Sequence, residues 1–310
     1  MSTESATQPF DHPALFYRGE QEYLAGTVPF VEEALAAGDP VAVAVPGANL
    51  ALIRAALGGQ AARVRLLDME RAGRNPGRII PRVLRAFAEG HPGRRARILG
   101  ESIWAGRTAV EYPACVQHEA LTNVAFQGRA ATIRCLYDAA RLAESVLADA
   151  YVTHPTVIDS GTRADSAAYA PQELLARYNQ PLSAPPDTPA TAYTATSLGE
   201  VRHVATRSAA ASGLRTPRLD DFELAVAELT TNSVVHGGGR GTLRVWADDR
   251  HVICEVQDAG LIDDPLAGRR LPPREQHGGR GLLLVNVVAD LVRTYSAPDR
   301  GTTTRVYFRR

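Results

Sequence analysis

Cysteine is scarce in this sequence and is spread thinly. The three cysteines, Cys115, Cys135 and Cys254, lie far apart, and no two of them have the spacing of a metal-binding or redox pair. We therefore expect buried free thiols in a reducing cytosol rather than disulfides.

The sequence also lacks long apolar runs and an excess of either charge. No uninterrupted apolar stretch approaches the ~20 residues of a membrane span, and the N-terminal MSTESATQPFDHP lacks the basic and apolar regions of a signal peptide. Lys plus Arg number 34 and Asp plus Glu number 34, so no bulk charge favours nucleic acid or an acidic membrane. We expect a cytoplasmic protein without direct contact to membrane or nucleic acid.

The composition is that of an ordinary soluble protein, with 45% apolar residues. The length of 310 residues suggests two domains. The stretch NQPLSAPPDTPAT (179–191) holds four prolines in thirteen residues and excludes regular structure. A small, polar stretch, 159–171, precedes it, and QELLARYN between them predicts one short helix. The predicted organisation is a domain at 1–158, a linker at 159–190 and a domain at 191–310.

The N-terminal half alternates between short apolar segments and helical ones. Alternating strands and helices predict an α/β domain, a parallel sheet covered by helices on both faces. The predicted strands are 41–45, 62–68, 95–103 and 131–138. The predicted helices are 49–58, 76–90, 110–128 and 139–150.

The C-terminal half has a different order, which predicts an α+β sandwich with helices on one face of a mixed sheet. Predicted helices at 197–213, 219–237 and 278–292 are combined with hairpins at 241–258 and 294–308. Asp220 or Asp221 is the expected N-cap of the second helix, and Gly237 its C-terminal stop.

Polar residues recur at one side of that second helix. Glu228, Asn232 and His236 follow one another at intervals of four, so Glu228 and Asn232 share a face. Asp258 ends a predicted strand, where its carboxylate can accept from the exocyclic amine of adenine, and Gly260 lets a base approach the backbone. We interpret His236 mainly as a partner of the helix dipole at the C-terminus.

Glycines at the start of the third helix complete the pattern. The segment HGGRGL (277–282) places Gly279, Arg280 and Gly281 where free backbone N–H groups and the helix dipole favour phosphate. Thr302 follows Gly301 at the start of the last strand and offers a hydroxyl group to the hydrogen bonds around the adenine base. Each element alone is a weak signal, but the four together, in this order, are specific.

These four elements resemble the boxes of the GHKL ATPases, and the small domain is similar to the anti-sigma factor serine/threonine kinases. The resemblance implies a Bergerat ATP-binding sandwich with ATP and Mg²⁺ as cofactors. By the same resemblance, Asn232 binds Mg²⁺ and Asp258 reads adenine. Glu228 acts as general base on a substrate hydroxyl, where a carboxylate near the γ-phosphate can accept the proton.

The sequence departs from the family pattern at position 262. Position 262 is Ile where the family often has a second glycine, which leaves the tightness of nucleotide binding open. His203 sits where a histidine-kinase phosphoacceptor is conceivable, but too few residues separate it from the next helix for a dimerisation hairpin. One of three arginines in the loop of residues 262–277 is a candidate for the γ-phosphate: Arg269, Arg270 and Arg274.

The N-terminal half resembles the MEDS sensory domain over about residues 10–158, through segments such as HPALFYRGEQEYL, ILGESIWAGR and HEALTNVAF. The resemblance implies a RecA-like fold used in sensing. The segment VPGANLAL after the first predicted strand lacks a P-loop, so we expect no nucleotide cradle there. Candidate pocket residues are Glu101, Trp104, His118, Glu119 and Asn123. For Glu119 and Asn123, the solvated face of an amphipathic helix is the alternative.

Together these patterns predict an anti-sigma regulatory factor gated by a sensory domain. It would bind ATP–Mg²⁺, phosphorylate a serine or threonine of a STAS-type anti-sigma antagonist, and sequester a sigma factor. Two further partners are compatible with the sequence: a small-molecule ligand of the N-terminal domain, and a second copy of the chain in a homodimer. The alternatives are a histidine-kinase-like sensor and a binding module that uses nucleotide without transferring phosphate.

Overall fold

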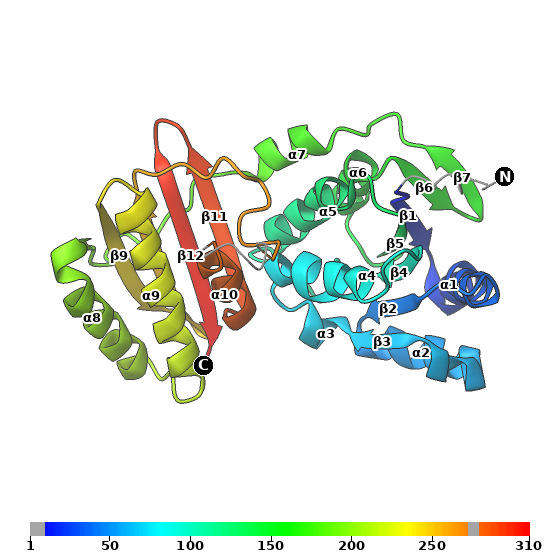
Figure 1. Cartoon of the computed structure of the whole chain (residues 1–310), viewed down its shortest axis with the longest axis horizontal. Coiled ribbons are helices and arrows are strands. Elements are labelled where there is room, and N and C mark those ends of the chain that lie inside the picture. Colours follow the sequence, from blue (N-terminus) through cyan, green and yellow to red (C-terminus); the bar gives the residue numbers. More distant parts are fainter. Residues whose placement is uncertain (1–9, 272–278) are drawn as a thin grey trace. The chain divides into compact units, whose positions relative to one another are not determined.

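The structure is a computed structural model that describes residues 10–271 and 279–310. By its own contacts the chain forms two compact units, each described separately below (Figure 1). The first contains the described residues up to Arg74 together with Ile79–Tyr178. The second contains Asn75–Arg78 and Asn179–Arg310.

The first unit is built on a seven-stranded sheet with the order β3-β2-β4-β5-β1-β6-β7. Its neighbouring strands are parallel except that β7 runs antiparallel to β6. The strands are β1 (Pro13–Tyr17), β2 (Val41–Val45), β3 (Arg65–Asp68), β4 (Ala96–Gly100), β5 (Ala131–Asp138), β6 (Thr156–Asp159) and β7 (Thr162–Asp165). The predicted α/β class is confirmed.

Helices cover both faces of this sheet, and its central strands are buried at nearly every position. In β1, Leu15 and Tyr17 join the core under the first two helices, while Phe16 points the other way and meets Tyr151 of α6 edge-on. The helices are α1 (Gly19–Ala36), α2 (Gly47–Leu57), η1 (Gly58–Arg63), α3 (Met69–Ala72), η3 (Ile80–Arg85), α4 (Ala86–Glu89), α5 (Tyr112–Phe126), α6 (Glu144–Thr153) and α7 (Pro171–Tyr178).

The second unit has a five-stranded sheet of order β11-β12-β10-β9-β8. Every pairing in it is antiparallel, so the prediction of a mixed sheet was wrong. The two hairpins, β9–β10 and β11–β12, impose this direction on two of the four pairings because short turns join only antiparallel strands. The strands are β8 (Thr191–Thr194), β9 (Arg240–Ala247), β10 (His251–Asp258), β11 (Leu291–Ala297) and β12 (Gly301–Arg309).

Helices of the second unit pack on one face of this sheet. α9 lies between α8 and α10 (Figure 1) and buries residues at helical spacing, among them Phe222, Val226 and Leu229. These meet inward-facing residues of β10 and β12, such as Val256 and Phe308, in one apolar core. The helices are η2 (Pro76–Arg78), η4 (Ala195–Ser197), α8 (Leu198–Ala211), α9 (Arg218–His236) and α10 (Gly281–Val288).

Two local expectations differ from the structure. α9 begins at Arg218 after Pro217, so neither Asp220 nor Asp221 is the N-cap. Both acids instead lie in the first turn, where their charge still favours the positive end of the helix dipole. Gly237 is the C-cap, as predicted.

The predicted linker contains one element that was not expected, the strand β7. The short helix predicted from QELLARYN is confirmed as α7, whose Leu174 is fully buried. The stretch 76–90, predicted as one helix, is divided into η2, η3 and α4. In the described part of the chain, no helix combines the length and apolar character that a membrane crossing requires.

Candidate nucleotide site

α9 carries the first part of the candidate site. Glu228 and Asn232 are partly buried on one side of the helix, and His236 is exposed at its last turn. The neighbouring core positions, Leu229 and Ser233, are buried against the sheet. The helix is therefore anchored by its apolar face, and the polar side chains are held at the border of the core.

Asp258, at the end of β10, is held in a fixed orientation. Its Oδ2 accepts a hydrogen bond from Ser233 Oγ at 2.6 Å, and its Oδ1 accepts from the Gly260 backbone N–H at 2.8 Å. Gly260 has no room for a side chain, since an added Cβ would lie 2.7 Å from the carbonyl oxygen of His236. The close approach of the His236 carbonyl requires glycine here. The approach of a base to Gly260 stays a prediction.

Thr302 lies directly opposite Asp258 in the β10–β12 pairing. Its hydroxyl donates to the Gly260 carbonyl oxygen at 2.8 Å and lies 2.8 Å from Ser296 Oγ. Ser296 Oγ in turn accepts from the backbone N–H of Ile262 at 3.0 Å. Ile262 does not have the positive φ that favours glycine, so the isoleucine at this position imposes no backbone strain.

The start of α10 lies against the polar side of α9. A Cβ on Gly281 would come within 2.6 Å of Glu228 Oε2 and 3.4 Å of Asn232 Nδ2. Gly279 has a φ of +75° and Arg280 is the N-cap of α10. The N-terminal backbone N–H groups of a helix have no intrahelical acceptor, which makes this end a place for phosphate.

These elements enclose a cavity of about 820 Å³, a size typical of small-molecule sites. Six of the eight predicted site residues line it: Asn232, Asp258, Gly260, Gly279, Gly281 and Thr302. The other two predicted residues, Glu228 and Arg280, are not among the described residues that line it. Its apolar wall is formed by Leu229, Val256, Leu261, Ile262, Leu266, Leu271 and Leu282.

The loop arginines differ in their placement. Arg270 lines the cavity and forms an ion pair with Asp264 at 2.6 Å. Arg269 is partly buried and is not among the described lining residues. Arg274 lies outside the described residues.

Sequence reasoning missed two residues that hold the site together, Ser233 and Ser296. Ser233 falls on the apolar period of α9, so a hydroxyl on a core-facing position was a usable signal. Ser296 gave no such signal in the sequence, because its partners Ile262 and Thr302 become its neighbours only once the sheet forms.

The residues present fit a nucleotide. A fixed carboxylate suits an amino-bearing base, the apolar wall suits its rings, and a glycine-rich helix start suits phosphates. The Asn232 amide oxygen is a hard oxygen ligand of the kind that Mg²⁺ prefers.

The candidate residues of the first unit divide into two buried networks. Glu101, at the end of β4, accepts from Tyr17 Oη at 3.0 Å and from Asn49 Nδ2 at 2.8 Å. Burial raises the pKa of the Glu101 carboxyl to about 7. Trp104 lies outside this network, with the Arg107 guanidinium 3.8 Å from its ring.

The second network surrounds Glu119 on α5. Glu119 is 1% exposed and His118 is 3% exposed, so the alternative of a solvated helix face was wrong for this helix. Asn123 is partly buried and donates to the carbonyl oxygen of Thr153 at 2.9 Å. The three cysteines are buried free thiols, as predicted.

Comparison with known families defines the class of each half. Residues 11–155 match the MEDS family, the methanogen/methylotroph DcmR sensory domain. Residues 191–308 match the histidine kinase-like ATPase domain. The chain therefore carries a MEDS sensory domain followed by a histidine kinase-like ATPase domain, and the sandwich described above is the fold of the latter.

A more particular likeness comes from a single protein. An anti-sigma F factor of Clostridium acetobutylicum is 30% identical to this chain over 95 residues. The match covers 27% of this chain and 65% of the length of that curated relative. It supports the predicted similarity to anti-sigma factors at the level of a distant relationship.

Proposed function

We propose that this protein is an anti-sigma regulatory factor whose ATPase-type domain phosphorylates a protein partner. One observation carries the proposal: motifs from α9, β10, α10 and β12, far apart in sequence, line one cavity of nucleotide size. The similarity to a protein named anti-sigma F factor supports a sigma factor and a STAS-type anti-sigma antagonist as partners.

The nucleotide would be held by parts of the cavity with separate tasks. Asp258 accepts a hydrogen bond from the exocyclic amine of adenine, because its carboxylate is an acceptor already oriented by Ser233. Thr302 and Gly260 close the same end of the cavity. Gly279, Arg280 and Gly281 receive the phosphates at the start of α10, and Asn232 holds Mg²⁺ next to them.

Glu228 would be the general base. Its Oε2 lies at the start of α10, where the γ-phosphate is expected, so a substrate hydroxyl placed there could transfer its proton to the carboxylate. When bound, Mg²⁺ offsets the charge that builds on the phosphoryl oxygens.

The deciding experiment compares the full chain with its Glu228→Gln variant, using radiolabelled ATP and purified antagonist proteins encoded in the same genome. The variant should keep the affinity for ATP and lose phosphotransfer, because the amide keeps the shape but accepts no proton. Glu223→Gln, an exposed position on the same helix, is the matched control. Phosphotransfer at the wild-type rate by Glu228→Gln would exclude this residue as the base.

A second function is favoured by the placement of Glu228 outside the described lining of the cavity. In this alternative the domain binds nucleotide and captures its partner without transferring phosphate. Binding of the partner that depends on ATP, together with no labelled product from the wild-type chain, would select the binding module over the kinase.

A further inference from the structure

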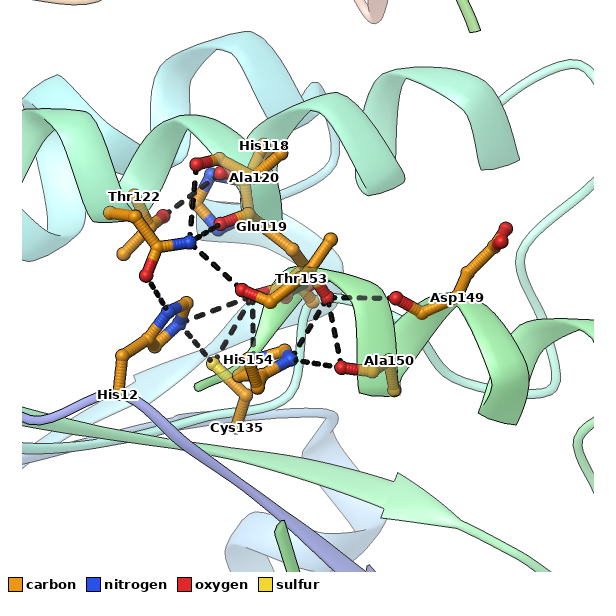
Figure 2. A network of polar contacts seen from close by, with 12 residues as sticks. His12, His118, Glu119, Ala120, Thr122, Cys135, Asp149, Ala150, Thr153 and His154 are labelled. Carbon is orange, nitrogen blue, oxygen red and sulfur yellow. Dashed lines mark hydrogen bonds and ion pairs between the residues drawn. The ribbon is translucent and has the colours of Figure 1, made fainter. Parts of the chain in front are cut away.

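A compact group of ligating side chains lies inside the sensory domain, which is a different unit from the one that contains the nucleotide cavity. Figure 2 shows His12, Glu119, Cys135 and His154 pointing toward one another. His12 precedes β1, Glu119 is on α5, Cys135 is on β5, and His154 follows α6. All four are buried, and their ligand atoms lie within 4.8 Å of one another.

Four distances between these atoms are close to the ligand-to-ligand distances of a tetrahedral metal site. Cys135 Sγ is 3.3 Å from His12 Nε2 and 3.2 Å from Glu119 Oε2. Both histidine Nε2 atoms are 3.6 Å from Glu119 Oε2. Zinc-to-ligand bonds of about 2.0–2.3 Å place tetrahedral ligands roughly 3.3–3.8 Å apart, whereas 3.6 Å is too long for a hydrogen bond.

The surroundings set both imidazole rings with Nε2 toward the centre. Asn123 uses its amide N–H groups on backbone carbonyls, so its Oδ1 accepts from His12 Nδ1 at 3.0 Å. His154 Nδ1 lies 2.9 Å from the Ala150 carbonyl oxygen, which can only accept. Each Nδ1 therefore carries the proton and each Nε2 presents a lone pair, as outer hydrogen bonds arrange for metal-bound histidines.

The centre then has too few protons for its acceptors. Ser102 Oγ donates to the other oxygen of Glu119, which suits a carboxylate. The two Nε2 atoms and Glu119 Oε2 are three acceptors, and the Cys135 thiol has a single S–H to donate. Among the described residues, His154 Nε2 is buried without a hydrogen-bond partner, and such a group is costly to leave unpaired.

We propose that His12, Glu119, Cys135 and His154 form a binding site for one divalent transition-metal ion, with Zn²⁺ as the preferred ion. Two nitrogens, a sulfur and a carboxylate oxygen match the ligand types that zinc takes. As the ion binds, the Cys135 S–H proton leaves to solvent and the thiolate coordinates in its place. Thiolate and carboxylate together then balance the charge of the ion.

Four protein ligands make this a closed site, which is the arrangement of structural zinc rather than catalytic zinc. The ion would tie the entry of β1, the middle of α5, β5 and the end of α6 to one point. Its binding free energy is then added to the stability of the sensory domain.

The test uses the full chain, purified without added chelator and analysed for metal by mass spectrometry. About one zinc per chain is expected for the wild type, and far below one for Cys135→Ala and His154→Ala. Cys115→Ala is the matched control, since it removes a buried free thiol of α5 outside the cluster and should retain the metal.

Cobalt and heat give independent readouts. Co²⁺ added to chelator-treated wild type should produce the visible bands of tetrahedral cobalt and a thiolate charge-transfer band, and Cys135→Ala should lose the charge-transfer band. Zn²⁺ should raise the melting temperature of the wild type and of Cys115→Ala, but not of Glu119→Gln. The proposal would be overturned if the folded wild type contained no metal, gave no cobalt bands and showed no change of melting temperature with Zn²⁺. The four side chains would then be a cluster joined by hydrogen bonds alone.

Discussion

Glu101 is a carboxyl group whose charge state depends on its burial. It is 2% exposed, and only Tyr17 and Asn49 are positioned to donate to it among the contacts described above. These two donors favour the charged form, but burial outweighs them and raises the pKa of Glu101 to about 7. A group with a raised pKa binds its proton more tightly in the folded state, so it stabilises the fold in acid and loses that contribution as the pH rises.

We therefore predict a specific pH dependence for Glu101→Gln. The stabilising contribution of Glu101 is complete below pH 4.5, its unfolded value, and is lost as the pH rises through about 7. The stability of the variant relative to wild type should rise by about 3 kcal/mol over that interval and stay level above it. Urea unfolding in a Trp246→Phe background, where Trp104 reports on the first unit, measures this difference. A difference that does not change with pH would contradict the prediction.

In the nucleotide site, Asp258 and Asn232 should differ in their dependence on Mg²⁺. Asp258→Ala removes an oriented acceptor and should weaken ATP binding by about 1–3 kcal/mol with or without the ion. Asn232→Ala should have a similar effect only when Mg²⁺ is present, since its proposed role is to hold the ion. Calorimetry with Mg²⁺ and with a chelator separates the two, and Asp249→Ala in the exposed β9–β10 turn is the control. Unchanged affinity in both variants would remove the site assignment.

The residues that sequence analysis identified share a local pattern. Glu228 and Asn232 repeat along one helix, and Asp258 and Gly260 are neighbours at a strand end, so spacing made them candidates. The resemblance to the GHKL ATPases then implied their roles. The metal cluster has no such pattern. Its ligands come from four segments as distant as His12 and His154, and no pair of cysteines marks it. Only the folded sheet brings them together.

At the scale of elements, the start of α10 is the most sensitive junction of the nucleotide site. Gly281 begins this helix with ordinary helical geometry, so alanine is compatible with the backbone. An added Cβ would lie 2.6 Å from Glu228 Oε2, so the flexible end of this side chain must shift away from the start of α10. The effect of alanine here is therefore spatial rather than conformational.

Gly281→Ala should therefore separate stability from binding. We expect little loss of unfolding free energy, since alanine is a better helix former than glycine, and ATP binding weakened by roughly tenfold, or 1.4 kcal/mol. Gly199→Ala in the first turn of α8, where an added Cβ meets no atom within 4 Å, is the matched control and should bind ATP normally. Wild-type affinity in Gly281→Ala would mean that phosphate is not held at this helix start.

Elements with a clear apolar pattern were predicted, and several without one were missed. The strands β2 and β5 are short, mostly apolar segments, and α9 buries residues at helical spacing. The strand β1 was not predicted because it is five residues long and begins with Pro13, a residue typical of a turn or strand edge. β8 escaped because it follows directly on the proline-rich stretch and is mostly exposed. Pairing with a neighbour, which sequence does not display, is what makes both of them strands.

At the scale of the whole molecule, the two units have separate cores. The apolar core of the second unit consists of residues from 193–308, and the core beneath α1 and α2 consists of residues from 15–158. The first unit is therefore not needed to complete the core that supports the nucleotide site. In the first sheet, the carboxyl ends of β1, β2 and β4 bring Tyr17, Asn49 and Glu101 together, and such strand ends are where α/β sheets bind ligands.

Regulation by the first unit is the expectation that follows. Without a P-loop it should bind no ATP, so the full chain should bind about one ATP, and the Asn232→Ala/Asp258→Ala double variant almost none. A signal bound at the first unit can change the second only if it binds the active and inactive states unequally. Full-length protein and fragment 190–310 should therefore differ in phosphotransfer or partner binding when metabolite extracts are added, with ATP affinity as the check that the fragment is folded. Residual ATP binding by the double variant would contradict the first expectation, and identical behaviour of chain and fragment under every condition would contradict the second.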